Sequence, residues 1–180
     1  MSYRVRIRIL PLLNSILPLA VAAALAPPLA AQAGQLDPSF GHAGKTMIDF
    51  NLSTDLARDV ALQPDGKLVV VGQTYTNNDY SGEDFAVTRH LPNGTLDPSF
   101  GGGDGKVTTD FPGLAAVASA VVVQPDGKIV VAGGAFPLFT FLGDIAVVRY
   151  NADGSPDTSF GTNGNGVVIT ALGATGSYAF

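Results

Sequence analysis

The sequence predicts an all-β protein: a partial β-propeller of two four-stranded antiparallel blades plus one extra strand, after an N-terminal signal peptide. Three observations support this fold class. The chain of 180 residues contains 22 glycines and 12 prolines, an excess typical of many tight turns. Several short motifs recur about 60 residues apart. Each interval also contains four short apolar segments separated by turn signals, and four strands are the content of one propeller blade.

Residues 1–33 have the pattern of an export signal. Arg4, Arg6 and Arg8 precede every acidic residue, and an apolar stretch follows that ends in the small-x-small pattern Ala31-Gln32-Ala33. The alternative is an uncleaved membrane anchor, but four prolines interrupt the stretch and would break such a helix. We therefore expect cleavage, no stable membrane span afterwards, and a periplasmic, cell-surface or extracellular location in a bacterium.

Composition excludes several kinds of site and partner. Cysteine is absent and there are only two histidines, so disulfide frameworks, thiolate metal sites and histidine-rich zinc sites are excluded. Removing the three leader arginines lowers Lys+Arg from 10 to 7 against 15 acidic residues, which leaves a formal charge of −8. An acidic chain of this kind disfavours binding to nucleic acid.

The segment 34–180 is predicted to be one domain of repeats. The motif LDPSFG stands at 36–41 and 96–101, and PDTSFG follows at 156–161, two offsets of 60 residues. Several independent motifs keep this register, and the single-residue changes between copies fall in predicted loops, where they cost little. The repeat units are about 36–95 and 96–155, followed by a truncated third at 156–180.

Turn chemistry and apolar runs place four strands in each repeat. Pro64-Asp65-Gly66 is typical of a hairpin turn, with proline at its first corner and glycine in the left-handed position. The runs Val69–Val71 and Val121–Val123 are continuously apolar, as strands buried on both faces require. A β-sandwich is the alternative, although sandwiches usually lack a long repeat. The predicted strands are 59–63, 67–72, 84–90 and 106–111, then 120–124, 128–133, 144–150 and 167–171, with Thr46–Phe50 as the extra strand.

The repeat motifs resemble a known family. QPDGKIVVAGG at 124–134, the stretch R-Y-N-x-D-G at 149–154 and LDPSFG are similar to the delta-60 repeat family. That resemblance implies an exported bacterial protein with β-propeller-like repeats and no generally assigned activity. Members usually carry many copies, so two blades and an orphan strand favour a truncated member over a fragment that assembles further. Two open blade faces would then favour self-association.

Two residue types recur in the loop that crosses between blades. Asp37, Asp97 and Asp157 could form one calcium loop per blade, but no loop has the alternating acidic ladder of a calcium site. We expect structural turns in which each aspartate accepts a hydrogen bond from the backbone two residues on, and no cofactor. The phenylalanines of the same loops are expected to be buried anchors between blades rather than a ligand-stacking platform: Phe40, Phe100 and Phe160.

The remaining candidate groups are expected to have structural or surface roles rather than functional ones. Arg89 and Arg149 lie on third strands that Asp84 and Asp144 open, and their repetition favours a structural ion pair over an anion site. The two histidines, His42 and His90, have no copies in the next repeat and are expected at the surface, without a metal. No nucleophile elbow, zinc-protease or phosphate-loop motif is present.

The loops at 73–83 and 134–143 differ most between the copies, and divergent loops on a repeated scaffold are where binding specificity resides. The candidate ligand-binding residues are Tyr75, Asn78, Tyr80, Phe136, Phe139 and Phe141.

The function that the sequence favours is a non-catalytic exported scaffold or binding module for an unknown ligand or protein. The alternative is a hydrolase or lyase that uses carboxylates around a central channel. Such enzymes gather unlike residues from several blades, whereas nearly every notable polar residue here has a copy in the next repeat.

Overall fold

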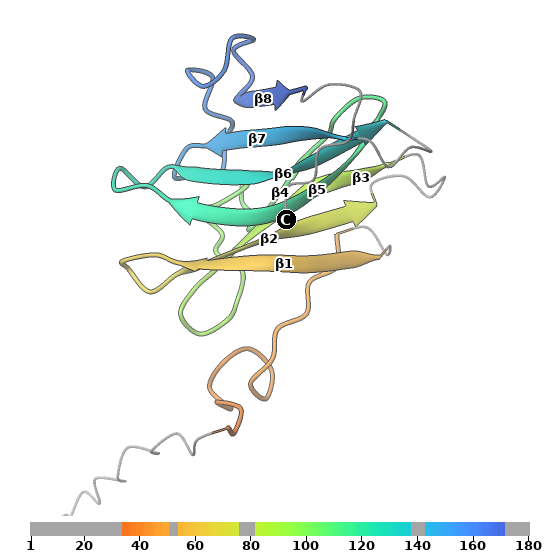
Figure 1. The fold of residues 1–180 in the computed structure, drawn as a ribbon. Coiled ribbons are helices and arrows are strands. Elements are labelled where there is room, and N and C mark those ends of the chain that lie inside the picture. The colour runs from red at the N-terminus through yellow and green to blue at the C-terminus, as the bar shows by residue number, and fades with distance from the viewer. Residues whose placement is uncertain (1–33, 51–53, 76–81, 138–142, 172–180) are drawn as a thin grey trace, which may run out of the picture. The chain divides into compact units, whose positions relative to one another are not determined.

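The computed structural model describes residues 34–50, 54–75, 82–137 and 143–171, and within these ranges it contains strands and turns but no helix (Figure 1). Two sheets are formed, with strand orders β1-β2-β3-β4 and β5-β6-β7-β8, and every neighbouring pair is antiparallel. The two four-stranded blades predicted from the sequence are therefore confirmed, and we call them blade one and blade two. The strands are β1 (Asp55–Leu62), β2 (Leu68–Tyr75), β3 (Glu83–His90), β4 (Lys106–Thr109), β5 (Leu114–Val123), β6 (Ile129–Pro137), β7 (Asp144–Tyr150) and β8 (Val167–Thr170).

Both blades open with the predicted hairpin. The amide of Gln63 donates to the carbonyl of Lys67 at 2.8 Å, and the amide of Gly66 donates to the carbonyl of Gln63 at 2.9 Å. The copy at 124–128 closes with the same two bonds, at 2.8 and 2.9 Å. Because a glycine takes the left-handed conformation in both turns, the first two strands of each blade meet in a fixed register.

The first strand of each blade starts earlier than predicted, at Asp55 instead of 59 and at Leu114 instead of 120. A β-bulge shifts the register of β1 between Ala57 and Asp59, and β5 has the equivalent shift. Opposite the first bulge the chain approaches so closely that a Cβ on Gly72 would lie 1.8 Å from the carbonyl oxygen of Leu56. The bulge breaks the alternation of side chains, which is why the sequence pattern hides the first half of the strand.

The extra strand predicted at Thr46–Phe50 is wrong, because residues 46–50 form no strand. In both blades the fourth strand forms because it is hydrogen-bonded to the third strand of the same blade. The described residues contain no such partner strand beside 46–50. Instead, the Lys106 ammonium donates to the carbonyl of Asp49 at 3.2 Å, and the amide of Phe50 donates to the Asp55 carboxylate at 3.0 Å.

The buried core lies between the two blades. We call the side of blade one that faces blade two its front face, and the side of blade two that faces blade one its rear face. Front-face side chains of blade one and rear-face side chains of blade two form one continuous apolar cluster. The front face of blade one contains Val69, Val71, Phe85, Val87 and Arg89, and the rear face of blade two contains Val121, Val131, Ala146, Val148 and Tyr150.

Positions that are buried between the two blades are exposed or half-buried where their copies lie on the two outward sides. Val60 and Leu62, on the rear face of blade one, are 55% and 70% exposed, whereas Val121 at the position of Val60 is only 7% exposed. The front face of blade two carries side chains that are half-buried or exposed: Val122, Val130, Ala132, Ile145, Val147, Arg149 and Val168. Burial in this molecule therefore depends on whether a neighbouring blade is present.

Candidate functional site

The crossing loops after the third strands carry the most organised polar groups. In the loop of blade one, the Asp97 carboxylate accepts hydrogen bonds from the amide of Ser99 at 2.9 Å and from its hydroxyl at 2.7 Å. The Asp157 and Asp37 carboxylates accept the same pair of bonds from the serines two residues on, at 3.0 and 2.7 Å and at 2.9 and 2.6 Å. The prediction of three aspartate turns is confirmed.

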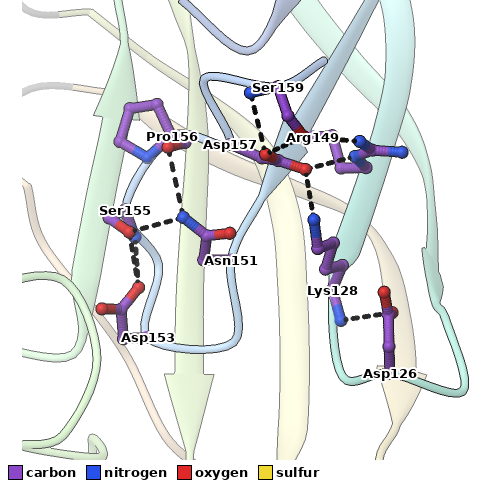
Figure 2. A network of polar contacts seen from close by, with 9 residues as sticks. All are labelled: Asp126, Lys128, Arg149, Asn151, Asp153, Ser155, Pro156, Asp157 and Ser159. Carbon is purple, nitrogen blue, oxygen red and sulfur yellow. Dashed lines mark hydrogen bonds and ion pairs between the residues drawn. The ribbon is translucent and has the colours of Figure 1, made fainter.

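Two cations share each of the two later aspartates. Arg89 Nε and Lys67 Nζ lie 2.8 and 3.2 Å from Asp97 Oδ2. Figure 2 shows the copy in blade two, where Arg149 Nε and Lys128 Nζ lie 2.6 and 2.7 Å from Asp157 Oδ2. Each arginine also donates to the serine of its loop. The aspartate, the serine, the arginine and the lysine thus form a closed polar cluster in each blade.

The predicted ion pairs exist, but their partners differ from those expected. The arginines pair with Asp97 and Asp157 of the crossing loops rather than with Asp84 and Asp144 at the openings of their own strands. The reason is the tight turn between the third strand and the loop, which carries the loop back over the strand end. The amide of Asp97 donates to the carbonyl of Arg89 at 2.8 Å, which brings the carboxylate beside the guanidinium.

Both clustered carboxylates are held ionised. Burial alone would raise the pKa of Asp97, but hydrogen bonds from Ser99 and Lys67 and the charge of Arg89 outweigh it, so its pKa lies well below 3.8. The hydrogen bond from Lys128, followed by those of Ser159, lowers the pKa of Asp157 in the same direction. Carboxylates in this state are poor proton donors near neutral pH, which argues against a role in acid catalysis.

Asp37 differs from its two copies. Its carboxylate is exposed, and hydrogen bonds from the Ser39 hydroxyl and amide lower its pKa. No lysine or arginine of the described ranges pairs with it. The loop at 36–41 therefore has the shape of the repeated loop but lacks the two cations of blades one and two.

Phe100 joins the blades. Its ring is fully buried, lies 4.7 Å from the Arg89 guanidinium, and packs so closely on Gly154 that a Cβ there would be 2.7 Å away. Beside the ring, the amide of Gly101 donates to the carbonyl of Asp153 at 3.0 Å. Arg89 Nη1 also donates to the carbonyl of Ala152 in the same turn. The predicted inter-blade anchor is confirmed at this position, and we call this arrangement the blade joint.

Its two copies fill the same role to different degrees. Phe40 is half-buried rather than buried as predicted, but it packs on Gly94 of blade one, where a Cβ would lie 3.0 Å from the ring, and the amide of Gly41 donates to the carbonyl of Asn93 at 2.7 Å. Phe160 stacks on its arginine at 4.6 Å but is only half-buried, since no further blade stands before it in the described residues.

The predicted ligand-binding loops are only partly described. Tyr75 and Phe136 are half-buried and lie on strands β2 and β6, opposite Glu83 and Ala115, rather than in loops. They occupy equivalent positions in different blades. Asn78, Tyr80, Phe139 and Phe141 lie outside the described residues, as does the predicted signal at 1–33, so a shared binding surface stays a prediction.

The two histidines differ in their exposure to solvent. His42 is exposed, as expected, but the surface position predicted for His90 is wrong, because its side chain is only 2% exposed. One ring nitrogen lies 2.9 Å from the Thr88 hydroxyl and the other 3.2 Å from the carbonyl of Gly94. The acceptor that satisfies the ring belongs to the next turn, so the sequence around the strand end gave no sign of it.

Sequence reasoning missed two contributors, Lys67 and Lys128, which complete the polar clusters. The available signal was their invariant place in the two QPDGK motifs. Across the described ranges, no group of three or more acidic or histidine side chains could hold a metal ion. In the same ranges, no helix is long and apolar enough to cross a membrane.

The all-β fold with two antiparallel blades agrees with a comparison against protein families. Residues 63–100 and 124–160 match the family model of a β-propeller domain of unknown function (DUF5122). Each matched segment runs from a QPDGK hairpin to the phenylalanine of the crossing loop or its equivalent, and so contains one complete polar cluster. No curated protein and no solved structure matches the chain.

Proposed function

We propose that this chain is an exported, non-catalytic repeat scaffold of the delta-60 type, which binds a ligand or protein through surfaces that differ between its blades. One observation carries the proposal: the charged groups of the polar clusters recur at equivalent positions in the two blades and pair with one another. Asp97 and Asp157 each hold an arginine and a lysine, and the serines complete both clusters. Groups engaged in this way organise a repeat and leave no paired acid and base for chemistry.

Export is the part of this proposal that the leader sequence supports. The chain should be expressed in a bacterial host with its own residues 1–33, and the N-terminus of the exported product sequenced. A product that starts at Gly34 is expected. In the matched control, Ala31→Arg places a large charged side chain where signal peptidase requires a small one, and cleavage should fail. Retention of the intact chain in the cytoplasm would contradict export.

Binding without turnover is the second part. We expect a screen of glycans and small molecules to find ligands whose affinity falls at least about tenfold in Tyr75→Ala or Phe136→Ala chains. Both side chains are half-buried at strand ends, so the variants test surface recognition more than folding. A matched control is Thr162→Ala, at an exposed position away from these strands. Turnover of a hydrolase or lyase substrate by the purified chain would instead favour the enzymatic alternative.

A further inference from the structure

The front face of blade two has the features of a surface that normally meets another blade. Its counterparts in blade one are fully buried against blade two, including Phe85 and Val87, whereas Ile145 and Val147 at the same positions of blade two are only half-buried and Val122 is 59% exposed. These apolar side chains lie on the same side of the sheet as Arg149, whose guanidinium stacks on the Phe160 ring. Contiguous exposed apolar groups of this kind mark interaction sites.

The blade joint of this face is already assembled on one side. Arg149 stacks on Phe160 and is paired with Asp157, as Arg89 is with Phe100 and Asp97 in blade one. In the complete joint, the arginine Nη1 and the amide after the phenylalanine donate to the turn of the following blade. Within the described residues, Arg149 Nη1 and the amide of Gly161 have no such acceptor. The missing component is therefore a glycine turn like that at 151–154.

One such turn in the same chain faces the opposite way. The Asn93-Gly94 turn on the rear side of blade one accepts Phe40 and the amide of Gly41, which stand where Phe160 and Gly161 would stand in a neighbouring chain. Residues 36–50 thus cover the rear face of blade one as a copy of the crossing segment 156–170. We call residues 36–50 the cap.

The cap makes fewer stabilising contacts than the segment it imitates. Among the described residues Asp37 has no cation, whereas Asp157 holds Arg149 and Lys128. Residues 46–50 have no ladder, whereas β8 is hydrogen-bonded to β7. A cavity of about 300 Å³ also remains between the cap and the sheet of blade one. The segment 156–170 is ordered by its own blade before it binds, so it loses less conformational entropy on docking.

We propose that the cap is displaceable, and that a second copy of this chain takes its place. Phe160 and Gly161 of one copy occupy the Asn93-Gly94 turn of the next, so the chains join head to tail through front and rear faces. A head-to-tail interface generates a closed ring when its rotation closes. The described blades of two copies number four, the smallest number with which propellers typically close. This inference concerns the chain's own copies and stands independently of which ligand the scaffold binds.

The exported chain should be examined by sedimentation velocity over a wide concentration range. Phe40→Ala loosens the cap and should strengthen association at least about tenfold, whereas Phe160→Ala should weaken it by a similar factor. Pro112→Ala, at an exposed position in the turn between β4 and β5 and outside both the cap and segment 156–170, should leave association unchanged. Circular dichroism of each variant verifies that the strands are retained.

A mixing experiment tests the head-to-tail geometry with surface changes that leave the core intact. Val122→Glu blocks the front face and Val60→Glu blocks the rear face, and both positions are more than half exposed. Neither variant should self-associate strongly, but their mixture should form a one-to-one pair through the remaining front and rear faces. The proposal is overturned if Phe40→Ala weakens association or leaves it unchanged, or if either blocked variant pairs with itself as well as with the other.

Discussion

Blade one and blade two repeat the same strands, turns and polar clusters, yet equivalent side chains have different surroundings. Val87 on the front of blade one is fully buried, and Val147 at the same position of blade two is half-buried. The backbone registers of β3 with β4 and of β7 with β8 are the same over four residue pairs. The comparison shows that the repeat encodes the sheet by itself, whereas its apolar core forms only with a neighbour. In this respect the blades resemble the units of other repeat proteins.

The rear faces differ in chemistry as well as in burial. In blade two, the Tyr150 hydroxyl reaches blade one and lies 2.5 Å from the hydroxyl of Thr109. In blade one, His90 occupies the position of Tyr150 and bonds within its own blade, to Thr88 and Gly94. Burial raises the pKa of the Tyr150 hydroxyl above its ordinary value, so the hydroxyl stays protonated and available as a hydrogen-bond donor. His90 thus needs no partner from a preceding blade, which fits a face covered only by the cap.

The sharpest test of this comparison is the phenylalanine of the blade joint. Phe100→Ala removes a fully buried ring between the blades and should lower the free energy of unfolding by about 3–5 kcal/mol. Phe160→Ala removes the equivalent half-buried ring and should cost only about 1 kcal/mol in the monomer. Urea unfolding followed by circular dichroism measures both. Equal losses would show that the two blades are equally supported by neighbours, and would contradict the comparison.

The fold was predictable where local chemistry decides it. The hairpin glycines, the aspartate turns and the anchoring role of Phe100 all follow from short motifs in fixed register, and the structure confirms them. The strand Thr46–Phe50 was predicted by copying the repeat, and it failed because a strand needs a partner as well as a sequence.

The candidate site was less predictable because its contacts are set by the path of the chain. Asp97 reaches Arg89 only after the loop turns back across the strand end, so the nearer Asp84 was the natural but mistaken choice of partner. His90 is buried by an acceptor from the turn at Gly94, which no periodicity in the sequence reports. Spacing identified which residues matter, but it did not identify which of them meet.

A second prediction compares two glycines that share a left-handed backbone. Gly127 and Gly154 have φ of 84° and 88°, so alanine at either position should cost about 1–2 kcal/mol in backbone strain. A Cβ on Gly127 would touch only the Ala152 side chain at 3.4 Å, whereas one on Gly154 would overlap the Phe100 ring at 2.7 Å. Gly154→Ala should therefore lose roughly 1 kcal/mol more in urea unfolding. Equal losses would mean that the ring moves aside freely and that the joint is loosely packed.

The smallest expected effect is the acid dependence of the two polar clusters. The pKa values of Asp97 and Asp157 are depressed in the folded chain. The unfolded chain therefore binds more protons than the folded one below about pH 4, so their contribution to stability is complete above the ordinary value of 3.8 and is lost as the pH falls below it. Protonated Asp97 leaves the Arg89 guanidinium, which also bonds Ala152 of blade two, without its carboxylate. Protonated Asp157 perturbs only contacts inside blade two.

Urea unfolding at pH 6 and pH 3 distinguishes the two clusters when Asp97→Asn and Asp157→Asn chains are compared with the parent. Each asparagine cannot titrate, so each variant should be less stable at pH 6 and should lose less stability on acidification than the parent chain does. Because Asp97 supports the contact between blades, Asp97→Asn should also make the transition less cooperative, with a lower dependence of the unfolding free energy on urea. Asp157→Asn should keep the parent dependence. If both variants lose as much stability between pH 6 and pH 3 as the parent chain, the depressed pKa values do not contribute to stability. If both variants lose cooperativity to the same extent, the blade joint does not depend on Asp97 more than on Asp157.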